Sequence, residues 1–433
     1  MIKIFNIWIK EYWSCILILL TIIGFVSKSL YNYPIGIMAV IGLYRVVLTP
    51  KDTWNNEIQK IFIIVFLCLW LPLLISFTDA VNQSRAAQTV LPYLRFMFAG
   101  LFIIQELTKN AHRLNFVVYA VFIIVTFWCL DASIQFLMGQ NLLGYPYSSW
   151  SSYDPKGAPN PSFNGAPVYY FSNLTGMFYP RNTIAHICSI LSMFCFFVVY
   201  QYAHKYKWLW LSLIPIFFVI FVSGRRAAWI MLALSSFGFV IYLCLYSENK
   251  KQIFKFIGMI TLIISIVLSS IVMLHKPTND RFKETLGLFS NNHELIDKAT
   301  AQRLPLWETA YSAFKANPVN GIGPRGFRYV YQDYASPNNY WETQTHPHLL
   351  LLEIMAETGG IGFLGYFILC YLLIKNAINR KKLKNEFPYL LPVLVAIFPF
   401  NAHMAFYGSI WSSMIWWLMA VYFSSIHLSE QKT

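Results

Sequence analysis

The stretch IFIIVFLCLWLPLLISFT runs from Ile61 to Thr78 and contains no charged side chain. A run of this length and character is long enough to cross the hydrocarbon core of a bilayer as a helix. Similar blocks recur along the whole chain of 433 residues, of which 57% are hydrophobic and 12% are charged. Soluble globular proteins carry about 25% charged residues. The composition therefore excludes a water-soluble protein and indicates a membrane protein that crosses the bilayer many times.

Block length predicts an all-α polytopic membrane protein with about twelve transmembrane helices. The expected spans are 12–29, 33–49, 61–78, 92–107, 114–136, 182–202, 208–223, 227–246, 256–274, 349–374, 388–403 and 408–427. Two connections are long and polar, 137–181 and 275–348. The predicted parts are therefore 1–274 with spans one to nine and the first long loop, 275–348 as a large outer loop with interfacial helices, and 349–433 with the last three spans and a cytoplasmic tail.

Basic residues divide unevenly between the two sides of the predicted membrane. With a cytoplasmic N-terminus, the inner segments hold fifteen Lys and two Arg, and the outer segments hold nine Arg and six Lys. Inner Lys satisfies the positive-inside rule, so the net charge of +14 does not require a nucleic-acid partner. Arg offers a planar fork that binds phosphate or carboxylate through two hydrogen bonds. The outer excess of Arg therefore indicates an anionic ligand there. The alternative for any single Arg is pairing with outer acids, such as Asp280, Glu284 and Glu308, and with phosphates of the outer leaflet.

The sharpest local feature is the segment Ser223–Trp229, which reads SGRRAAW. It forms a very short outer turn between two predicted spans, so it places two guanidinium groups at the membrane surface. Charges at this depth are costly unless paired, and they mark functional sites by default. The turn also exposes N–H groups at the start of the next helix, whose positive dipole end favours an anion. We therefore expect Arg225 and Arg226 to bind an anion of lipid character, with anchoring of the helix end as the alternative.

The large loop contains an amphipathic pattern after Arg303. Its apolar residues fall at helical spacing and form one face: Leu304, Trp307, Tyr311 and Phe314. Asn317-Pro318 ends the pattern, and Gly321 and Gly323 supply a turn. The spacing predicts a helix that lies on the outer surface with this face against the membrane body, and with Arg303 at its beginning. The aromatic residues of the other long loop, 137–181, are expected to form an interfacial belt, with stacking on sugars as the alternative.

The segment Thr345–His348 reads THPH and directly precedes span ten. An imidazole at the outer mouth of a span can act as a general base near neutral pH, and a capping role for His348 is the alternative. The Pro between the two histidines and the lack of a nearby ligand cluster argue against a metal. The seven cysteines all lie in apolar blocks and form no CxxC motif. We therefore expect no metal site, and structural roles for His186, His293 and His403.

Together these three features resemble the bacterial O-antigen ligase and polymerase superfamily. The order of the motifs, the twelve-span layout and the single large outer loop before the histidine all agree with that family. The ligase signature is a His followed by Gly eleven residues later and by a small residue fourteen later, a spacing that His348, Gly359 and Gly362 satisfy. The signature also has Asn, Ser or Gln directly after the His. This chain has Leu349 there, so the choice between ligase and polymerase stays open.

The resemblance implies a GT-C-type glycosyltransferase. Such an enzyme moves a glycan from undecaprenyl diphosphate to an acceptor at the periplasmic face of the bacterial inner membrane. The acceptor is lipid A–core for a ligase and a second lipid-linked repeat unit for a polymerase. Both termini would be cytoplasmic, and the long loops periplasmic. By the same resemblance, Arg226 and Arg303 match the family's motif arginines, and His348 matches its essential histidine.

The implied chemistry needs no cofactor. Arg226 and Arg303 would neutralise the diphosphate leaving group. His348 would take the proton of the acceptor hydroxyl, and displacement in one step would invert the anomeric carbon. The residues expected to bind diphosphate or glycan are Arg225, Arg226, Arg303, His346, Arg181 and Arg325. A lipid or glycan transporter is the rival from another class, but transporters typically place polar residues near the bilayer midplane, and these spans are almost free of charge.

Overall fold

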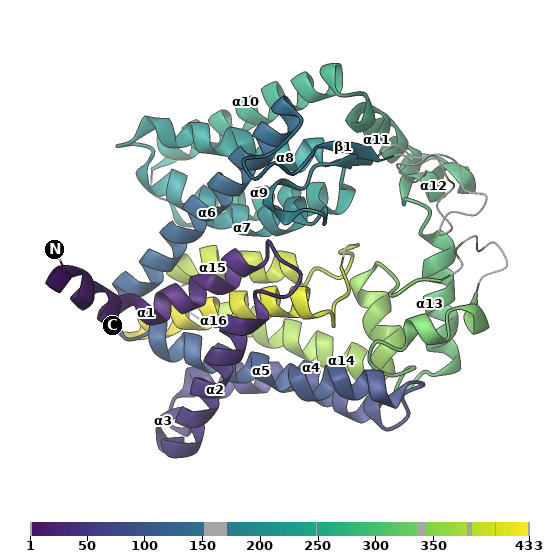
Figure 1. Cartoon of the computed structure of the whole chain (residues 1–433), viewed down its shortest axis with the longest axis horizontal. Helices are drawn as coiled ribbons and strands as arrows, with labels where there is room; N and C mark the ends of the chain where they lie inside the picture. The colour runs from purple at the N-terminus through teal and green to yellow at the C-terminus, as the bar shows by residue number, and fades with distance from the viewer. Residues whose placement is uncertain are drawn as a thin grey trace.

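The computed structural model of the chain describes residues 2–150, 171–247, 249–335, 339, 341, 343–378, 383–402 and 404–431. It consists almost entirely of helices (Figure 1). The longer ones are α1 (Ile2–Gly24), α2 (Asn32–Leu48), α4 (Glu57–Phe77), α5 (Gln83–Leu107), α6 (Ala111–Met138), α7 (Ile184–Tyr202), α8 (Leu213–Val222), α9 (Arg226–Tyr246), α10 (Lys250–Leu274), α14 (Leu350–Ile378), α15 (Leu383–Ala396) and α16 (Ser409–Gln431).

Shorter elements fill the connections. The short α-helices are α3 (Pro50–Trp54), α11 (Lys276–Leu286), α12 (His293–Ala299) and α13 (Leu304–Ala316). The 3₁₀ helices are η2 (Gly176–Phe178), η3 (Lys207–Ser212), η4 (Gly287–Phe289), η5 (Phe327–Tyr329) and η6 (Gln332–Tyr334). Strands β1 (Ser148–Trp150) and β2 (Phe171–Asn173) form one antiparallel pair. The residues between them that were expected to belong to an aromatic belt, 151–170, lie outside the described residues.

In the described part of the chain, eight helices are long and apolar enough to cross a membrane: α4, α5, α6, α7, α9, α10, α14 and α16. Three shorter apolar stretches lie at 11–24, 32–48 and 207–222, and these coincide with predicted spans one, two and seven. The predicted eleventh span, 388–403, overlaps α15, which ends early at Ala396. The membrane character and the helical class are therefore confirmed, and the number of twelve spans stays a prediction.

Asparagine side chains begin many of these helices. In five of them an Asn precedes the first turn, and its side-chain oxygen accepts a backbone N–H of that turn: Asn56, Asn82, Asn110, Asn249 and Asn292. Such a cap stabilises a helix by about 1 kcal/mol, because it satisfies an N–H group that has no partner within the helix. The caps explain why apolar blocks of similar composition begin at these residues.

The helices pack around α7 and α16. In the most apolar windows of these helices, 83% of α7 residues and 89% of α16 residues are buried, against 22% in α10. Helix α16 packs against α5 and α15, and α7 packs against α6 and α9. Helix α10 lies at one edge of the molecule and exposes apolar side chains such as Phe254 and Met273 (Figure 1). This distribution suits helices α7 and α16 enclosed by protein, and α10 facing lipid.

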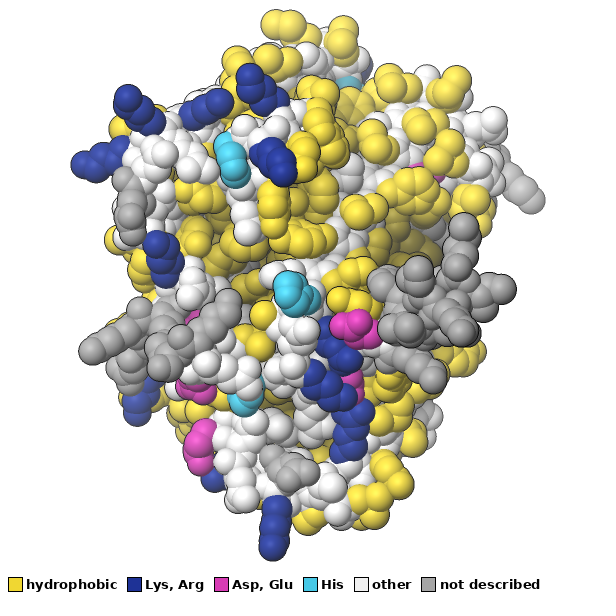
Figure 2. Space-filling view, turned by 90° about the vertical axis from the view of Figure 1, so that its left-hand side faces the viewer, with side chains coloured by type: hydrophobic (Ala, Val, Ile, Leu, Met, Phe, Trp, Pro, Cys, Tyr) yellow, Lys and Arg dark blue, Asp and Glu magenta, His cyan; other side chains and the backbone are white. Residues whose placement is uncertain are grey.

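The molecule has two opposite ends. Both termini lie at one end, which we call the termini face, and α11, α12 and α13 lie at the other, which we call the loop face (Figure 1). Lys and Arg side chains gather on the termini face (Figure 2). Arg45 and Arg113, which come from two different helices, both pair there with the buried carboxylate of Glu106, at 2.6 and 2.7 Å. The predicted catalytic residues all belong to segments of the loop face.

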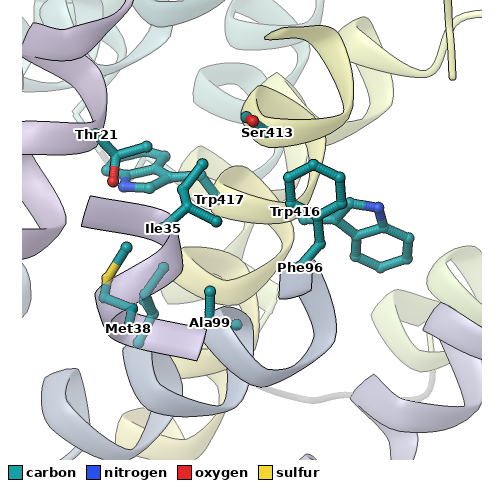
Figure 3. A pocket seen from close by; sticks show the side chains of 10 residues that line it. Thr21, Ile35, Met38, Phe96, Ala99, Ser413, Trp416 and Trp417 are labelled. Carbon is teal, nitrogen blue, oxygen red and sulfur yellow. The ribbon is translucent and has the colours of Figure 1, made fainter. Parts of the chain in front are cut away.

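A small cavity lies inside the membrane body between α1, α2, α5 and α16 (Figure 3). Its walls are mostly apolar and include Trp416 and Trp417, with the hydroxyl groups of Thr21 and Ser413 as polar exceptions. Its volume of about 10 Å³ is space for about one water molecule. The cavity is therefore a packing gap and not a substrate site.

Helix α14 is broken in the middle, at Gly359. This residue has φ 63° and ψ −157°, which interrupts the helix. The loop segment 318–323 lies in the break and replaces the missing helical bonds. The carbonyls of residues 356 and 357 accept from the N–H groups of residues 322 and 323, at 2.9 and 3.0 Å. The N–H groups of residues 360 and 361 donate to the carbonyls of residues 318 and 319, at 2.8 and 3.3 Å.

This exchange is needed because unsatisfied backbone groups at membrane depth cost several kcal/mol each. It also explains the glycines of the motif. A Cβ atom on Gly321 would lie 2.6 Å from the carbonyl oxygen of Ala356, and one on Gly359 would lie 2.2 Å from that of Val319. Both residues also have a positive φ. Only glycine lets the two backbones approach so closely in this conformation.

We predict that Gly359→Ala destabilises the protein by more than about 1–3 kcal/mol, because it combines a left-handed backbone with a clash against backbone. Thermal unfolding in detergent would measure this as a lower Tm. Gly258→Ala is the matched control, since a Cβ atom there meets nothing within 4 Å in α10. Equal Tm values for the two variants would show that the segment 318–323 does not dock on α14 in this way.

Candidate active site

The turn between α8 and α9 places two arginines at the start of a membrane helix. Gly224 has φ 63°, which reverses the chain within one residue. The Ser223 hydroxyl donates to the Ile220 carbonyl at 2.7 Å and accepts from the Arg225 N–H at 3.3 Å. Arg225 precedes α9 with an extended backbone, and Arg226 is its first residue. The positive end of the α9 dipole therefore adds to the charge of the two side chains.

Arg226 joins α9 to the two short helices of the large loop. Its guanidinium pairs with the Glu284 carboxylate of α11 and donates to the carbonyls of Lys298 and Ala299 in α12. Arg281 pairs with the same Glu284 oxygen at 2.9 Å. The side chains of Arg226 and Arg281 are 14% and 8% exposed. These contacts hold the segment 276–299 on the start of α9. Arg226 therefore has a structural role at the loop face and also contributes positive charge to it.

Arg303 comes from the residue that precedes α13. The Leu304 N–H donates to the Asp297 carboxylate at 3.1 Å, and Pro305 occupies the first turn, where its missing N–H costs nothing. The Arg303 guanidinium donates to the Ala402 carbonyl at 2.8 Å. Burial is the main reason why the pKa of Arg303 falls to about 10. The charges of three neighbouring guanidinium groups lower this pKa further: those of Arg225, Arg226 and Arg281.

We call Arg225, Arg226, Arg281 and Arg303 the arginine cluster. Burial, and then the charge of Arg281, also lower the pKa of Arg225 to about 10. The lowered pKa of Arg225 and of Arg303 reflects first the burial of each group and then the positive charge of its neighbours. Both guanidinium groups nevertheless remain protonated at neutral pH. The cluster therefore offers a positive potential, at least partly shielded from water, to an anionic group.

The structure brings together Arg226 and Arg303, which lie far apart in the sequence. It also adds two residues that the sequence analysis did not select. Arg281 is one of them, and its spacing of three residues from Glu284 on one helix was the available signal. His186 is the other. It lies in the first turn of α7, is 8% exposed, and is close enough to Arg225 and Arg303 to interact with their charges.

The two motif histidines contact each other. Their ring centroids are 3.9 Å apart, and His346 shares a hydrogen bond of 2.8 Å with the Thr345 hydroxyl. His348 has φ 54°, a left-handed conformation that costs a residue other than glycine about 1 kcal/mol or more. Strain of this kind concentrates at active sites, because the surrounding structure must hold the residue in place.

The segment 399–402 lies between the histidines and the arginine cluster. The N–H groups of Leu350 and Leu351, at the start of α14, donate to carbonyls of this segment at 2.9 and 3.1 Å. Arg303 donates to the same segment from the other side, at Ala402. His348 is two residues before Leu350. The segment 399–402 therefore holds both the start of α14, which follows the predicted base His348, and Arg303, a predicted diphosphate-binding residue.

Arg325 has a different environment. Its backbone N–H donates to the Glu357 carboxylate at 2.7 Å, and its guanidinium lies 3.7 Å from the Glu353 carboxylate. Both carboxylates belong to α14 and are at most 1% exposed. Glu353 also accepts the N–H groups of Phe406 and Tyr407, at 2.9 and 3.4 Å. These contacts make Arg325 a residue that joins the large loop to α14 and to the segment before α16.

Arg181 lies at the turn between α1 and α2. Its guanidinium donates to the Phe25 carbonyl at 3.0 Å, and burial lowers its pKa. The charges that act on the Arg225 and Arg303 guanidinium groups come from the arginine cluster itself and not from Arg181. The structure therefore does not bring Arg181 into the arginine cluster.

The predicted apolar face of α13 is wrong. The helix forms over the expected residues, but its buried face consists of small or short side chains: Pro305, Leu306, Thr309, Ala310 and Ala313. Tyr311, which the spacing assigned to the buried face, is 46% exposed. The reason is that α13 packs closely on α14, at Ala356, and small residues allow the two helices to approach. The aromatic residues are left at the rim of that contact.

Within the described ranges, no group of three His, Cys, Asp or Glu side chains is placed to hold a metal ion. The seven cysteines are all free thiols. The arginine and histidine side chains of the loop face can supply electrostatic stabilisation by guanidinium groups and proton transfer by imidazole.

Comparison with known proteins agrees with this site. Residues 210–367 match the family described as O-antigen ligase. The matched region begins in η3 and ends within α14, so it contains the arginine cluster, α13, the motif histidines and the broken helix. No curated protein matches the chain. The predicted resemblance to the O-antigen ligase and polymerase superfamily is confirmed over this region.

Proposed function

We propose that this protein is an O-antigen ligase with a GT-C-type glycosyltransferase mechanism. It transfers O-antigen glycan from undecaprenyl diphosphate to an outer-core sugar of lipid A–core. The observation that carries the proposal is the arginine cluster, in which four guanidinium groups lie close enough to repel one another beside the start of the membrane helix α9. A lipid diphosphate brings two phosphate groups to the depth at which this cluster lies. The family match over residues 210–367 supports the same reaction class.

The roles in the reaction follow from the chemistry of the side chains. Arg225, Arg226 and Arg303 bind the diphosphate and stabilise the charge that develops on it as the bond to the anomeric carbon breaks. His348 accepts the proton of the acceptor hydroxyl while that oxygen forms the new bond. Attack from the side opposite the diphosphate inverts the anomeric carbon. His346, whose ring contacts His348, orients the base.

The orientation in the bacterial inner membrane follows from charge. The termini face carries many Lys and Arg side chains (Figure 2) and therefore lies in the cytoplasm. The loop face, with the arginine cluster and His348, then lies in the periplasm. The donor glycan and the acceptor both reach the active site from that side.

An O-antigen polymerase is the second candidate, and one observation favours it. Leu349 follows His348 directly, at the place where the ligase signature has Asn, Ser or Gln. Leu349 is the residue next to the predicted base. Because its side chain is only partly buried, it can influence the choice of acceptor. A polymerase performs the same displacement, but its acceptor is a second lipid-linked repeat unit.

The test uses the purified protein in detergent with EDTA, lipid-linked glycan as donor and lipid A–core as acceptor. We expect joined product on a gel, and none when lipid A–core is omitted. Elongation of the lipid-linked glycan without joining would identify a polymerase. Activity that disappears in EDTA and returns with a divalent cation would overturn the metal-independent mechanism. The absence of both products would favour transport over catalysis.

A further inference from the structure

A second pair of arginines lies outside the arginine cluster, where the turn between α1 and α2 meets the start of α16 and the loop before α7. Arg95 comes from α5, and Arg181 comes from the loop before α7. Both guanidinium groups are close enough to the Tyr31 hydroxyl, at the start of α2, to interact with it. Tyr31 is 2% exposed and packs on Phe25, with ring centroids 5.4 Å apart. The two guanidinium groups therefore lie near the same buried hydroxyl, at a place where three separate segments of the chain meet.

Arg95 is held from several sides. Its guanidinium donates to the Ser409 hydroxyl at 2.6 Å, and that hydroxyl donates to the Asn32 side chain at 3.0 Å. The guanidinium carbon lies 4.8 Å from the centre of the Phe96 ring. Its Nε atom is buried and, among the described residues, has no hydrogen-bond partner. The side chain is thus fixed in place with part of its donor capacity unused.

Arg181 is fixed in a similar way. Its Nη2 atom donates to the Phe25 carbonyl at 3.0 Å, at the end of α1. Its Nη1 atom is buried, and no described residue accepts a hydrogen bond from it. Two guanidinium groups at one place therefore each retain an N–H group that faces no protein acceptor in the described structure.

Neither guanidinium forms an ion pair with a carboxylate in the part of the chain that the structure describes. The contrast with the termini face is direct, since Arg45 and Arg113 both pair there with the buried Glu106. A partly buried charge without a counter-ion costs free energy, and within membrane helices it marks a functional site by default. The missing counter-ion is therefore expected to come from a ligand.

The position of the pair relates it to the active site. Arg181 is three residues before α7 begins, and His186, in the first turn of α7, reaches the charges of Arg225 and Arg303. The start of α7 thus separates the Arg95–Arg181 pair from the arginine cluster.

We propose that Arg95 and Arg181 form a second anion site, which binds a phosphate or carboxylate group of the acceptor glycolipid. This inference rests on the proposed function, in which the arginine cluster takes the diphosphate of the donor. The second site would hold an anionic acceptor across α7 from the donor, so its neutral reacting hydroxyl can approach His348. A bilayer phospholipid carries the same chemistry in its headgroup, and the experiment separates the two sources.

The experiment measures binding of labelled lipid A–core to the purified full-length protein in detergent, without donor and without turnover. We expect Arg95→Gln and Arg181→Gln each to weaken this binding by about tenfold or more, because a charge-assisted hydrogen-bond pair is lost. Arg95→Lys should retain part of the affinity. Lys28→Gln is the matched control, since Lys28 is an exposed cation of the same turn. Binding of the lipid-linked donor should be unchanged in all variants.

Phosphatase-treated lipid A–core identifies the group that is bound. If phosphatase treatment weakens binding to the wild type but not to the variants, the site binds phosphate. If the variants lose as much affinity for the treated probe as for the untreated probe, the site binds carboxylate. Unchanged acceptor binding in Arg181→Gln would overturn the proposal, and so would a parallel loss of donor binding. Competition by phosphatidylglycerol as effective as that of unlabelled acceptor would assign the site to bilayer lipid instead. None of these results depends on product formation, which tests the proposed function separately.

Discussion

Replacing His348 by asparagine is expected to lower the rate of glycan transfer by about 10²–10⁴-fold, the contribution of a well-placed general base. Asparagine is the better choice than alanine here, because His348 has φ 54° and asparagine tolerates a left-handed backbone. The variant therefore removes the base with little change in strain. Transfer would be measured with saturating donor and acceptor, and the Tm in detergent would show that the fold is retained.

The controls for His348 come from the other histidines. His293→Ala removes an exposed imidazole of α12 and should leave the rate unchanged. His346→Ala removes the ring that contacts His348 and should cause a smaller loss than His348→Asn. A fully active His348→Asn variant would exclude this residue as the base. Loss of transfer in His346→Ala alone would exchange the roles of the two histidines.

Arg303→Gln is expected to separate activity from stability. Transfer should fall by about 10²–10³-fold, as when one donor to a developing oxyanion is removed. The Tm should stay the same or rise, because the pKa of Arg303 is lowered to about 10 by burial and by three like charges. Gln can still donate a hydrogen bond to the Ala402 carbonyl. A rise in Tm together with a loss of rate would show that the cluster stores repulsion that the donor diphosphate relieves.

Two further variants serve as comparisons for Arg303→Gln. Arg303→Lys keeps the charge but not the planar fork, so an intermediate rate is expected. Lys315→Gln removes an exposed cation at the other end of α13 and should change neither rate nor Tm. A strongly lowered Tm in Arg303→Gln would mean that its bond to Ala402 matters more for the fold than for the substrate.

The transmembrane helices were predictable because twenty-residue apolar blocks have few alternatives in a bilayer. The break in α14 was not. Residues 349–374 read as one apolar span, and the conformation of Gly359 depends on the loop segment 318–323 that lies in it. The buried face of α13 was also missed, because the spacing of large apolar residues ignores how closely alanines allow two helices to pack.

The candidate site was partly predictable for a similar reason. Arg226 and Arg303 stand out because arginine is unusual at the ends of membrane helices, yet their proximity depends on how α11 and α12 fold against α9. In the sequence, Arg281 does not stand out from the other arginines of the loop. In the structure it lies near Arg226, because both side chains pair with Glu284. His186 lies in an apolar block, so the sequence contained no sign that its ring reaches two guanidinium groups.

The backbone exchange between α14 and the segment 318–323 has a practical consequence for protein engineering. The large loop is not an appendage that ends where α14 begins, since α14 completes its own hydrogen bonding with loop residues. A chimaera that exchanges 275–348 between two relatives would combine the loop of one protein with the broken helix of the other. The hydrogen bonds between loop and helix would then join two segments that do not belong together. The unit that keeps this backbone exchange intact runs from Lys276 to Ile378. Attempts to move acceptor choice between such enzymes should place their junctions outside those residues.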